Sequence, residues 1–476
     1  MSKPAKKEGK APTYRIPADS PWANAWKMAA GLGALGIAAS AVGMFSDTHR
    51  FAFSWLFAFM FFLALGLGGL FFVLGQHLTG SGWGVPLRRT AEMLMAGLPV
   101  FLILFVPIAV NMHELYPWLE EHGAGHGEEH EGGHGGGHEG GEGHEAGGHE
   151  EHGSLLGFGT QAQAQEARDP WDVHPNEREP DTRTHTPEHA AHAEIMESKT
   201  WFLDHGLFLV RAGVYFLAWI LLAYFFFTWS TRQDKEKGLA LTQRMEKTAP
   251  FATFVFGFSL TFAAFDWMMS LEPSWYSTIF GVIYFAIAAI IGHAVIILLT
   301  LAMRRSGLLR EAISVEHFHD IGKLLHGFIV FWAYVSVSQF LLIWYAGIPE
   351  ESTYYHLRWW GGGGWMNISV VVILAGFVIP FFLLMSRNFK RNLPWLGFSA
   401  AWILVVQIGQ LYWLVMPYAD QTGLVETQLH LHWLDFAAFF AVGGVYMAVV
   451  LWNMTRFPLV PVGDPRLDRG LHHEVV

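Results

Sequence analysis

The chain has 476 residues, of which 52% are hydrophobic, 15% aromatic and only 15% charged, a composition that favours a membrane protein over a soluble one. Its formal net charge of −11 comes from one segment: residues 112–152 contain 11 Glu and no Asp, Lys or Arg, and the rest of the chain balances 30 acidic against 30 basic residues. The absence of cysteine excludes disulfides, thiol catalysis, iron–sulfur clusters held by this chain and covalently attached haem. The basic residues are scattered over short loops, so no nucleic-acid partner is expected.

Ten apolar stretches are long enough to cross a bilayer, which takes about 20 residues of helix. An open strand would leave backbone groups unsatisfied in lipid, so each stretch is predicted to be a helix and the fold class to be an all-α polytopic membrane protein. The first stretch is a full span with nine others after it, so it is not expected to be a cleaved signal peptide. In chain order the stretches lie near residues 25–45, 51–77, 87–111, 200–229, 249–270, 275–303, 322–347, 366–386, 395–417 and 434–454.

Lys and Arg gather in alternate loops, while the short loops between them offer only Arg50 and Arg358. This asymmetry predicts that both termini lie in the cytoplasm and that the long insertion lies outside. The chain is then divided into a cytoplasmic tail, three spans, the insertion, seven spans and a second tail, at residues 1–24, 25–111, 112–199, 200–454 and 455–476.

Between His113 and His152 the insertion is rich in His, Glu and Gly. Such a segment buries too little apolar surface to fold alone, which favours a solvated or partner-contacting loop. Weak binding of Zn, Cu or Ni is the other interpretation, because imidazole suits these ions. The irregular spacing gives no dedicated metal site, so none is predicted.

Ionisable groups inside a bilayer are costly, so each is a candidate for function. Near the predicted outer surface, Asp204, His205 and Arg211 begin the fourth span, and Asp266 and Glu272 end the fifth. Acids, an imidazole and a fixed cation beside apolar residues suit the headgroup of a quinol, which needs hydroxyl partners and proton acceptors. The alternative is an ion pair of Arg211 with Asp204 or Asp266 that only joins helices.

A second set of polar side chains lies toward the predicted inner side and along the seventh and ninth spans. Spaced across a bundle, such groups relay protons, although each alone suits an ordinary hydrogen bond between helices. Bound haem b is not expected, because no span shows the repeated His spacing of a two-haem bundle. The candidate proton path consists of His77, Glu92, His293, Lys323, His326, Gln339, Gln407 and Gln410.

Three segments resemble the ActF subunits of alternative complex III, a bacterial quinol:electron-acceptor oxidoreductase: FAAFDWMMSLEPSWYSTIFGVIYFA, HFHDIGKLLHGFIVFWAYVSVSQFLLIWYAGIPEES and PFFLLMSRNFKRN. The resemblance covers most of residues 20–460. It implies the wider NrfD/PsrC-like group of quinone-associated subunits, with two four-helix bundles and flanking helices, in the bacterial inner membrane. By motif it points to Asp266 and Glu272, and to a second element containing His317, His319, Asp320, Lys323 and His326.

The resemblance also implies partners and a cofactor. The partners are a paralogous NrfD-like subunit, an iron–sulfur subunit, c-type cytochromes, lipids and, in some complexes, a haem–copper oxidase; the cofactor is menaquinone or ubiquinone, bound here or in the paralogue. The leading hypothesis is thus a subunit of a quinol-oxidising complex without its own redox centre. The alternative is a non-catalytic scaffold for the redox subunits. A secondary transporter ranks last, because the Gly run at 361–364 precedes a span rather than interrupting one.

Overall fold

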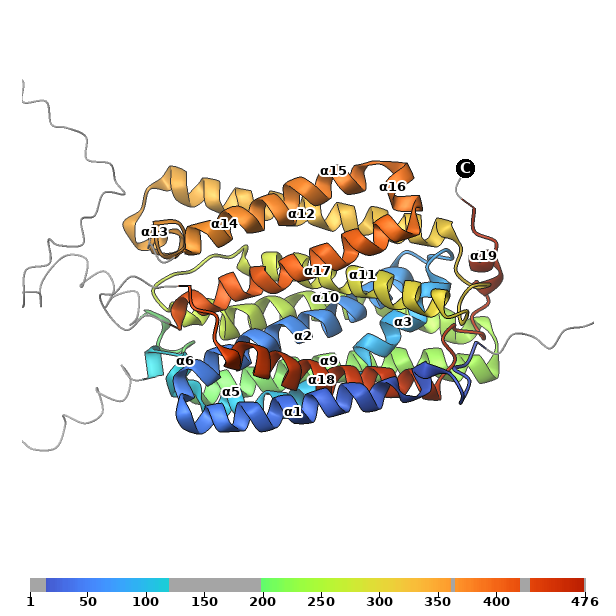
Figure 1. The fold of residues 1–476 in the computed structure, drawn as a ribbon, viewed down its shortest axis with the longest axis horizontal. Helices are drawn as coiled ribbons and strands as arrows, with labels where there is room; N and C mark the ends of the chain where they lie inside the picture. The colour runs from blue at the N-terminus through green and yellow to red at the C-terminus, as the bar shows by residue number, and fades with distance from the viewer. Residues whose placement is uncertain (1–13, 120–197, 361–363, 420–428, 475–476) are drawn as a thin grey trace, which may run out of the picture.

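The computed structural model describes residues 14–119, 198–360, 364–419 and 429–474 of the chain (Figure 1). Within these ranges the protein is helical and contains no strand. Ten helices or helix groups are long and apolar enough to cross a membrane, which confirms the predicted fold class. The His-rich part of the insertion, residues 120–197, lies outside the described residues.

The ten spans follow the predicted order. They are α1 (Ala25–Ser46), α2 (Thr48–Leu78), the group α3 (Val85–Met95), α4 (Val100–Leu104) and α5 (Val106–Val110), then α9 (His205–Glu236), α10 (Leu239–Trp267), α11 (Phe280–Arg305), α12 (Val315–Ala346), the group α14 (Trp365–Ile373), η4 (Leu374–Val378) and α15 (Ile379–Met385), α17 (Leu393–Val415) and α18 (Trp433–Arg456). Short elements connect them: η1 (Pro21–Asn24), α6 (Met112–Leu115), η2 (Met269–Leu271), α13 (Pro349–Tyr355), η3 (His356–Trp360), α16 (Arg387–Arg391), η5 (Met416–Tyr418) and α19 (Leu467–Leu471).

Both ends of the described chain lie at one end of the molecule, as an even number of spans requires (Figure 1). There the backbone N–H of Leu459 donates to the carbonyl of Tyr14 over 2.7 Å. We call this the terminal end. The opposite end, where Leu119 and Ser198 flank the insertion, is called the loop end.

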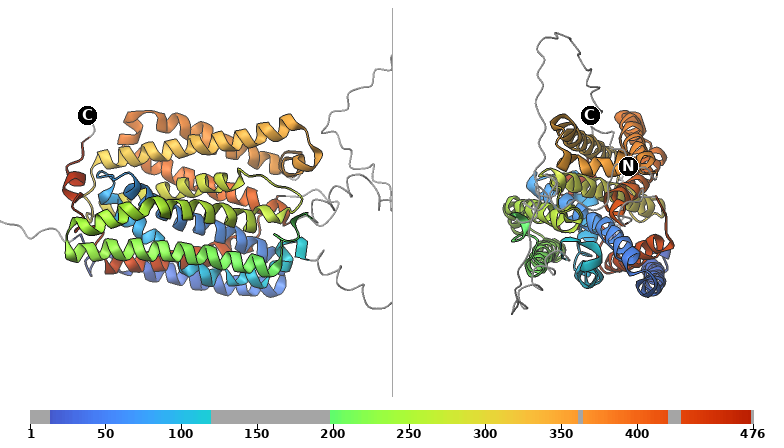
Figure 2. Two further views of the ribbon diagram at one scale, coloured as in Figure 1. Left: turned by 180° about the vertical axis from the view of Figure 1, so that it is seen from behind. Right: turned by 90° about the vertical axis from the view of Figure 1, so that its left-hand side faces the viewer.

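The spans form two bundles and a flanking pair (Figure 2). The first bundle contains α2, α3, α9 and α10, and the second contains α11, α12, the α14–α15 group and α17. Helices α1 and α18 pack on each other along their length and on α2. Because almost every residue of α2 is buried, this helix is the centre of the molecule and its sequence is apolar all round.

The two bundles meet where α2 crosses α11, and at this crossing the two helix backbones are in close contact. A Cβ atom on Gly68 would collide with the carbonyl oxygen of Ala288 and the backbone of Gly292. Small residues let helix backbones approach in this way and strengthen helix association inside a membrane. The same packing joins α1 to α18, where Gly36 lies against the backbone of Ala441.

Replacing Gly292 with Leu is therefore expected to force α2 and α11 apart and to lower the free energy of unfolding by about 1–3 kcal/mol or more. Thermal unfolding of the detergent-solubilised protein measures the effect. Gly409→Leu is the matched control, because a Cβ atom there meets nothing within 4 Å. Equal melting temperatures for the two variants would contradict the close-contact account.

The third span is broken, a feature that its continuous apolar sequence does not predict. Pro99 lies between α3 and α4, where the ring prevents a regular helical hydrogen bond. The tyrosine hydroxyl of Tyr446 donates to the carbonyl of Leu94 (2.8 Å), and the indole of Trp55 donates to that of Leu104 (2.9 Å). Two carbonyl groups near the break thus accept hydrogen bonds from protein side chains.

Candidate functional site

A bidentate ion pair lies at the loop end of the first bundle. Arg211 on α9 donates from Nε and Nη2 to the two carboxylate oxygens of Asp266 on α10, each over 2.9 Å. Tyr215, one turn further along α9, donates to the same carboxylate over 2.7 Å, and the Phe202 ring lies 4.0 Å from the guanidinium. Asp266 is fully buried, so its charge depends on these partners.

Two other residues of the predicted outer site lie apart from this pair. Asp204 is the N-cap of α9, where its carboxylate accepts the backbone N–H of Leu207 over 2.8 Å. Both Asp204 and His205 are exposed. The structure therefore brings together Arg211 and Asp266, and it adds Tyr215, which the spacing of four residues on α9 indicates in retrospect.

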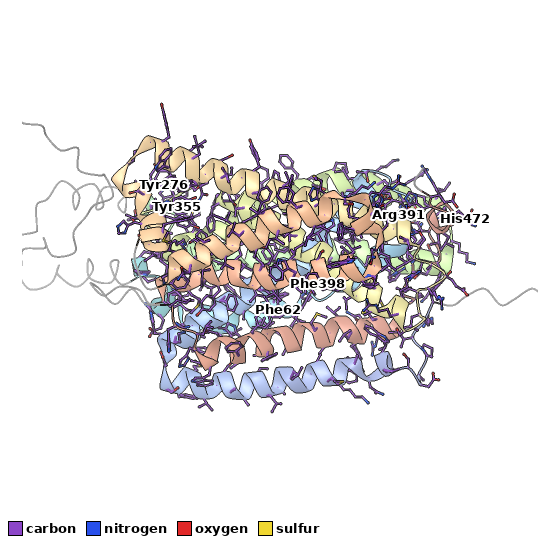
Figure 3. The ribbon with its side chains drawn as sticks, turned by 45° about the horizontal axis from the view of Figure 1, so that its top comes forward. Phe62, Tyr276, Tyr355, Arg391, Phe398 and His472 are labelled. Atoms are coloured by element: carbon purple, nitrogen blue, oxygen red, sulfur yellow. The ribbon has the colours of Figure 1, made fainter. Side chains whose placement is uncertain are left out.

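Glu272 lines a pocket of about 290 Å³ beside the ion pair. Lys199 also lines it, donates to the carbonyl of Pro273 over 2.6 Å and lies 5.0 Å from the Tyr276 ring. Burial lowers the pKa of the Lys199 ammonium, and the nearby Glu272 carboxylate opposes that shift. Figure 3 shows Tyr276 and Tyr355 at this end of the molecule.

A second group of charges, which we call the Glu92 cluster, is buried at the terminal end. It consists of Arg88, Arg89, Glu92, Asp234 and Asp464. Glu92 on α3 pairs with Arg88 (2.9 Å) and Arg89 (3.3 Å). Arg88 reaches Asp464 of the C-terminal segment (2.8 Å), and Arg89 reaches Asp234 on α9 (2.7 Å). Both arginines and Glu92 are 0% exposed, so the cluster joins three segments through fully desolvated ion pairs.

Residues around the Glu92 cluster differ in how well they are paired. Ser230 on α9 donates to Glu92 over 2.8 Å, and Arg466 pairs with Asp464. The guanidinium of Arg88 and that of Arg466 hold the pKa of Asp464 well below its usual range against the opposing effect of burial. His77 is also buried, and neither of its ring nitrogens has a hydrogen-bond partner in the described part of the chain.

A cavity of about 610 Å³ connects the terminal end with His293. Gln76, Arg469 and His473 line it, together with Gly and Ser residues of the α2–α3 loop. His293 on α11 is buried among phenylalanine rings and donates from Nδ1 to the carbonyl of Ala289 over 2.7 Å. In the neutral ring this leaves Nε2 as an acceptor on a side chain that lines the cavity.

The start of α12 closes the terminal end beside this cavity. Asp320 accepts from His473 and from Lys323, each over 2.6 Å, and His319 lies 3.7 Å from the same carboxylate. Lys323 is exposed, whereas the half-buried ring of His326 packs 5.3 Å from Phe381. Figure 3 shows His472 and Arg391 at this end of the molecule.

The three glutamines of the predicted path lie in the second bundle. Gln339 accepts from Ser277 (2.9 Å) and donates to Tyr355 (3.1 Å). Gln407 is fully buried without a partner for its amide among the described residues, and the Oε1 atom of Gln410 is likewise unpaired there. The residues of the predicted proton path thus lie in separate places. His77 and Glu92 are in the first bundle. His293 lies on α11 of the second bundle, beside the cavity, and the other residues are on α12 and α17 of the same bundle.

Arg50 and Arg358, which the sequence places in short loops, are buried. Arg50 lies on α2, 7% exposed, and pairs with Asp435 on α18 over 2.8 Å. Arg358 is 0% exposed and donates to the backbone carbonyls of Tyr354 (2.9 Å) and Leu414 (3.0 Å). Both arginines tie the loop-end segments to the bundles.

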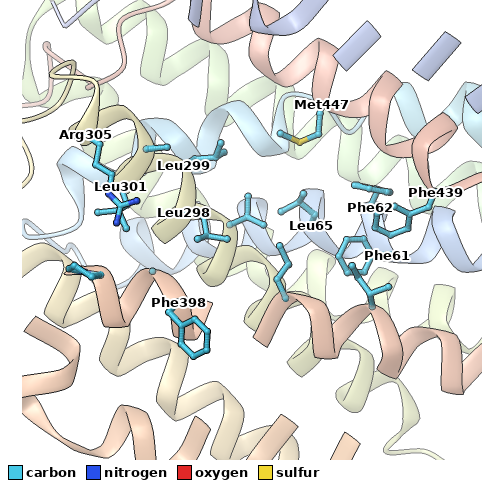
Figure 4. Close-up of a pocket in the computed structure, with 16 residues that line it drawn as sticks. Phe61, Phe62, Leu65, Leu298, Leu299, Leu301, Arg305, Phe398, Phe439 and Met447 are labelled. Carbon is cyan, nitrogen blue, oxygen red and sulfur yellow. The ribbon is translucent and has the colours of Figure 1, made fainter. Parts of the chain in front are cut away.

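A cavity of about 720 Å³ is lined by residues of α2, α11, α17 and α18 (Figure 4). Its lining is apolar apart from Arg305, which lies at one end, with Phe62 and Phe439 at the other. The described lining contains no carboxylate, imidazole or hydroxyl group. This cavity therefore offers room for apolar chains and no means of proton transfer.

The fold and these clusters define the class: an all-α, multi-pass membrane protein with ionisable residues buried at both ends of its first bundle. No protein-family model and no curated protein matches the sequence.

Proposed function

We propose that this chain is an integral membrane subunit of a complex that oxidises quinol and passes the electrons to cytochrome c. It contributes a quinone pocket at the loop end and part of a proton path at the terminal end. It resides in the bacterial inner membrane with both termini in the cytoplasm. The three segments that resemble ActF subunits support this assignment, and the lack of cysteine suits a subunit whose partners hold the redox centres.

The observation that carries the proposal is the cavity that reaches His293 from the terminal end. An imidazole can accept and release a proton, and an ionisable side chain inside a membrane span is a candidate for function because burying it is costly. In the second bundle, Gln407 and Gln410 are buried amides with unpaired atoms in the described structure, which suits a partial proton path.

Quinone binding draws support from the pocket beside Arg211 and Asp266. The pocket combines Glu272 and Lys199 with the rings of Trp201, Phe202 and Tyr276. Quinol oxidation releases two protons. The Glu272 carboxylate at the loop end would favour release of these protons on the outer side of the membrane. In the proposed assembly the electrons pass to an iron–sulfur subunit and c-type cytochromes, next to a paralogous NrfD-like subunit and, in some complexes, a haem–copper oxidase. Lipid acyl chains fit the apolar cavity beside Arg305.

A non-catalytic scaffold is the second candidate, and one observation favours it. Arg211 and Asp266 satisfy each other, as in an ion pair that serves only to join helices. Deleting residues 120–152 tests the docking role: a scaffold that acts through this segment loses the cytochromes on purification. A transporter is disfavoured, because carbonyls near the break in the third span are held by Tyr446 and Trp55.

Replacing Asp266 with Asn tests the proposed quinone site. We expect quinol turnover by the complex, purified through a tag on this chain, to fall about tenfold or more, while its subunits still co-purify. Tyr215→Phe removes one hydrogen bond to Asp266 and keeps the ion pair, so a smaller loss is expected. Glu114→Gln, at a half-exposed loop-end carboxylate, is the control and should leave turnover unchanged. Unchanged turnover in a stable Asp266→Asn complex would contradict a direct role.

A further inference from the structure

The second bundle contains a cavity of about 190 Å³, which we call the Gln410 cavity. Helices α12, α14 and α17 enclose it, and α13 with η3 covers it at the loop end. It is separate from the pocket beside Glu272, because the stacked rings of Trp275 and Tyr354, with centroids 4.1 Å apart, lie between the two. Aromatic side chains dominate its wall: Trp332, Phe340, Tyr355, Trp359, Phe377 and Trp413.

Unpaired polar atoms belong to this wall. The Oε1 atom of Gln410, the Oγ atom of Ser336 and the indole Nε1 of Trp332 are buried, and none has a hydrogen-bond partner in the described residues. Gln410 is only 2% exposed. Leaving a buried polar group without a hydrogen-bond partner is energetically costly, so three such groups around one cavity indicate that a ligand supplies the missing partners.

The backbone around the cavity is irregular in two places. η3 and η4 are both π-helical turns, and they contribute Trp359 and Phe377 to the wall. Such turns are rare and occur frequently at functional sites. One carbonyl of η4, that of Ala375, is held by the indole of Trp402 over 2.9 Å. Both π-helical turns thus contribute to the shape of the cavity.

The lining also limits the kind of ligand. No acidic or basic side chain is among the described residues that line the cavity, and the neighbouring Arg358 is engaged with carbonyls of Tyr354 and Leu414. A neutral molecule is therefore favoured over a phospholipid headgroup. Val337 and Ile373 line the cavity and are 61% and 43% exposed on the outer surface of α12 and α14, which gives access from the lipid.

We propose that the Gln410 cavity binds the ring of a lipid-soluble quinone or quinol, with its isoprenoid tail leaving between α12 and α14. Gln410 Oε1 accepts a hydrogen bond from a hydroxyl group of the quinol, whereas Trp332 Nε1–H and the Ser336 hydroxyl donate hydrogen bonds to a ring oxygen of either form. The aromatic wall stacks on the ring. This inference rests on the proposed function and places a quinone site in the second bundle, in addition to the pocket beside Glu272.

The test uses the full-length chain in lipid nanodiscs and a short-tailed quinone that carries a photoreactive azido group. Saturable binding is followed by quenching of tryptophan fluorescence, and the labelled peptides are identified by mass spectrometry. We expect labelling within residues 332–340 or 405–414. Gln410→Leu should weaken binding about tenfold, since it removes one buried hydrogen bond to the ligand, and Ser336→Phe should abolish binding by filling the cavity.

Control measurements separate this inference from the proposed function. Without ligand, Gln410→Leu should melt at or above the temperature of the unaltered chain, because Oε1 loses no partner. Saturable binding that maps to residues 198–203 or 265–276 and is weakened by Glu272→Gln alone would overturn the inference and leave the proposed function standing. Absence of any saturable binding would count against both. Competition by added phosphatidylglycerol would assign the cavity to lipid and overturn the inference.

Discussion

Replacing Glu92 with Ala is expected to lower the free energy of unfolding by about 3–5 kcal/mol. Glu92 is fully buried and is the shared partner of Arg88 and Arg89, which are also 0% exposed. The substitution leaves two desolvated guanidinium groups with only Asp464 and Asp234 to balance them. A buried guanidinium group that lacks a full set of partners costs far more free energy than the loss of an exposed ion pair. Glu92→Ala is therefore the substitution with the largest stability effect that we expect.

Thermal or denaturant unfolding of the solubilised chain measures this difference. Glu236→Ala is the matched control, because Glu236 also forms a four-residue-spaced pair with an arginine, Arg232, but both side chains are at least half exposed. The control should change stability by less than about 1 kcal/mol. A loss for Glu92→Ala as small as that of the control would show that water or a partner already solvates the cluster.

Replacing His293 with Phe is expected to have the largest effect on function. Phe fits the site, because the imidazole already packs against the rings of Phe71, Phe72 and Phe328. The substitution removes the proton-accepting Nε2 atom at the cavity. We expect proton-coupled quinol turnover by the purified complex to fall about a hundredfold, the loss typical of a missing proton-transfer group.

The measurement follows quinol oxidation and the appearance of protons with a pH-sensitive dye in sealed proteoliposomes. His49→Phe is the control, because His49 is half exposed at the loop end and pairs there with Glu114. Normal proton release by a stably assembled His293→Phe complex would remove His293 from the path. A fall in turnover with an unchanged proton-to-electron ratio would limit its role to quinol chemistry.

The ten spans were predictable because a bilayer demands long apolar helices, and the sequence contains ten such stretches. Helix ends were less predictable. α10 begins at Leu239 and α12 at Val315, before the apolar stretches do, because charged residues continue a helix into the headgroup region. The break at Pro99 shows that a local proline outweighs a continuous apolar run.

Partners of the buried charges were only partly predictable. The Arg211–Asp266 pair was one of two pairings that the sequence left open, and the structure selects it because Asp204 is used as the N-cap of α9. An Asp directly before an apolar helix is a typical N-cap, so this signal was present in the sequence.

The Glu92 cluster could not be assembled from local patterns. Arg88 and Glu92 have the spacing of an ion pair within a helix, but Asp234 and Asp464 come from distant segments. Arg88 and Arg89 are fully buried, which two adjacent basic residues between apolar stretches do not indicate. Pairing between residues that are distant in the chain depends on tertiary packing. The spacing of residues along the sequence does not predict it.

Of the residues that line the Gln410 cavity, the sequence singled out Gln339 and Gln410. Gln410 in an apolar span indicated polar chemistry. The π-helical turn η4 is followed within two residues by Pro380, which has no N–H to donate to a preceding carbonyl, whereas η3 contains no proline. A cavity is a gap between helices from different parts of the chain. Its presence therefore follows from packing and not from composition.

Purification of the intact assembly through a tag on this chain tests the central claim most directly. After mild solubilisation, we expect the preparation to contain c-type haem and iron–sulfur clusters and to reduce cytochrome c with added quinol. Isolation of the chain by itself under conditions that preserve other membrane complexes, or of an assembly without quinol-dependent electron transfer, would contradict the account.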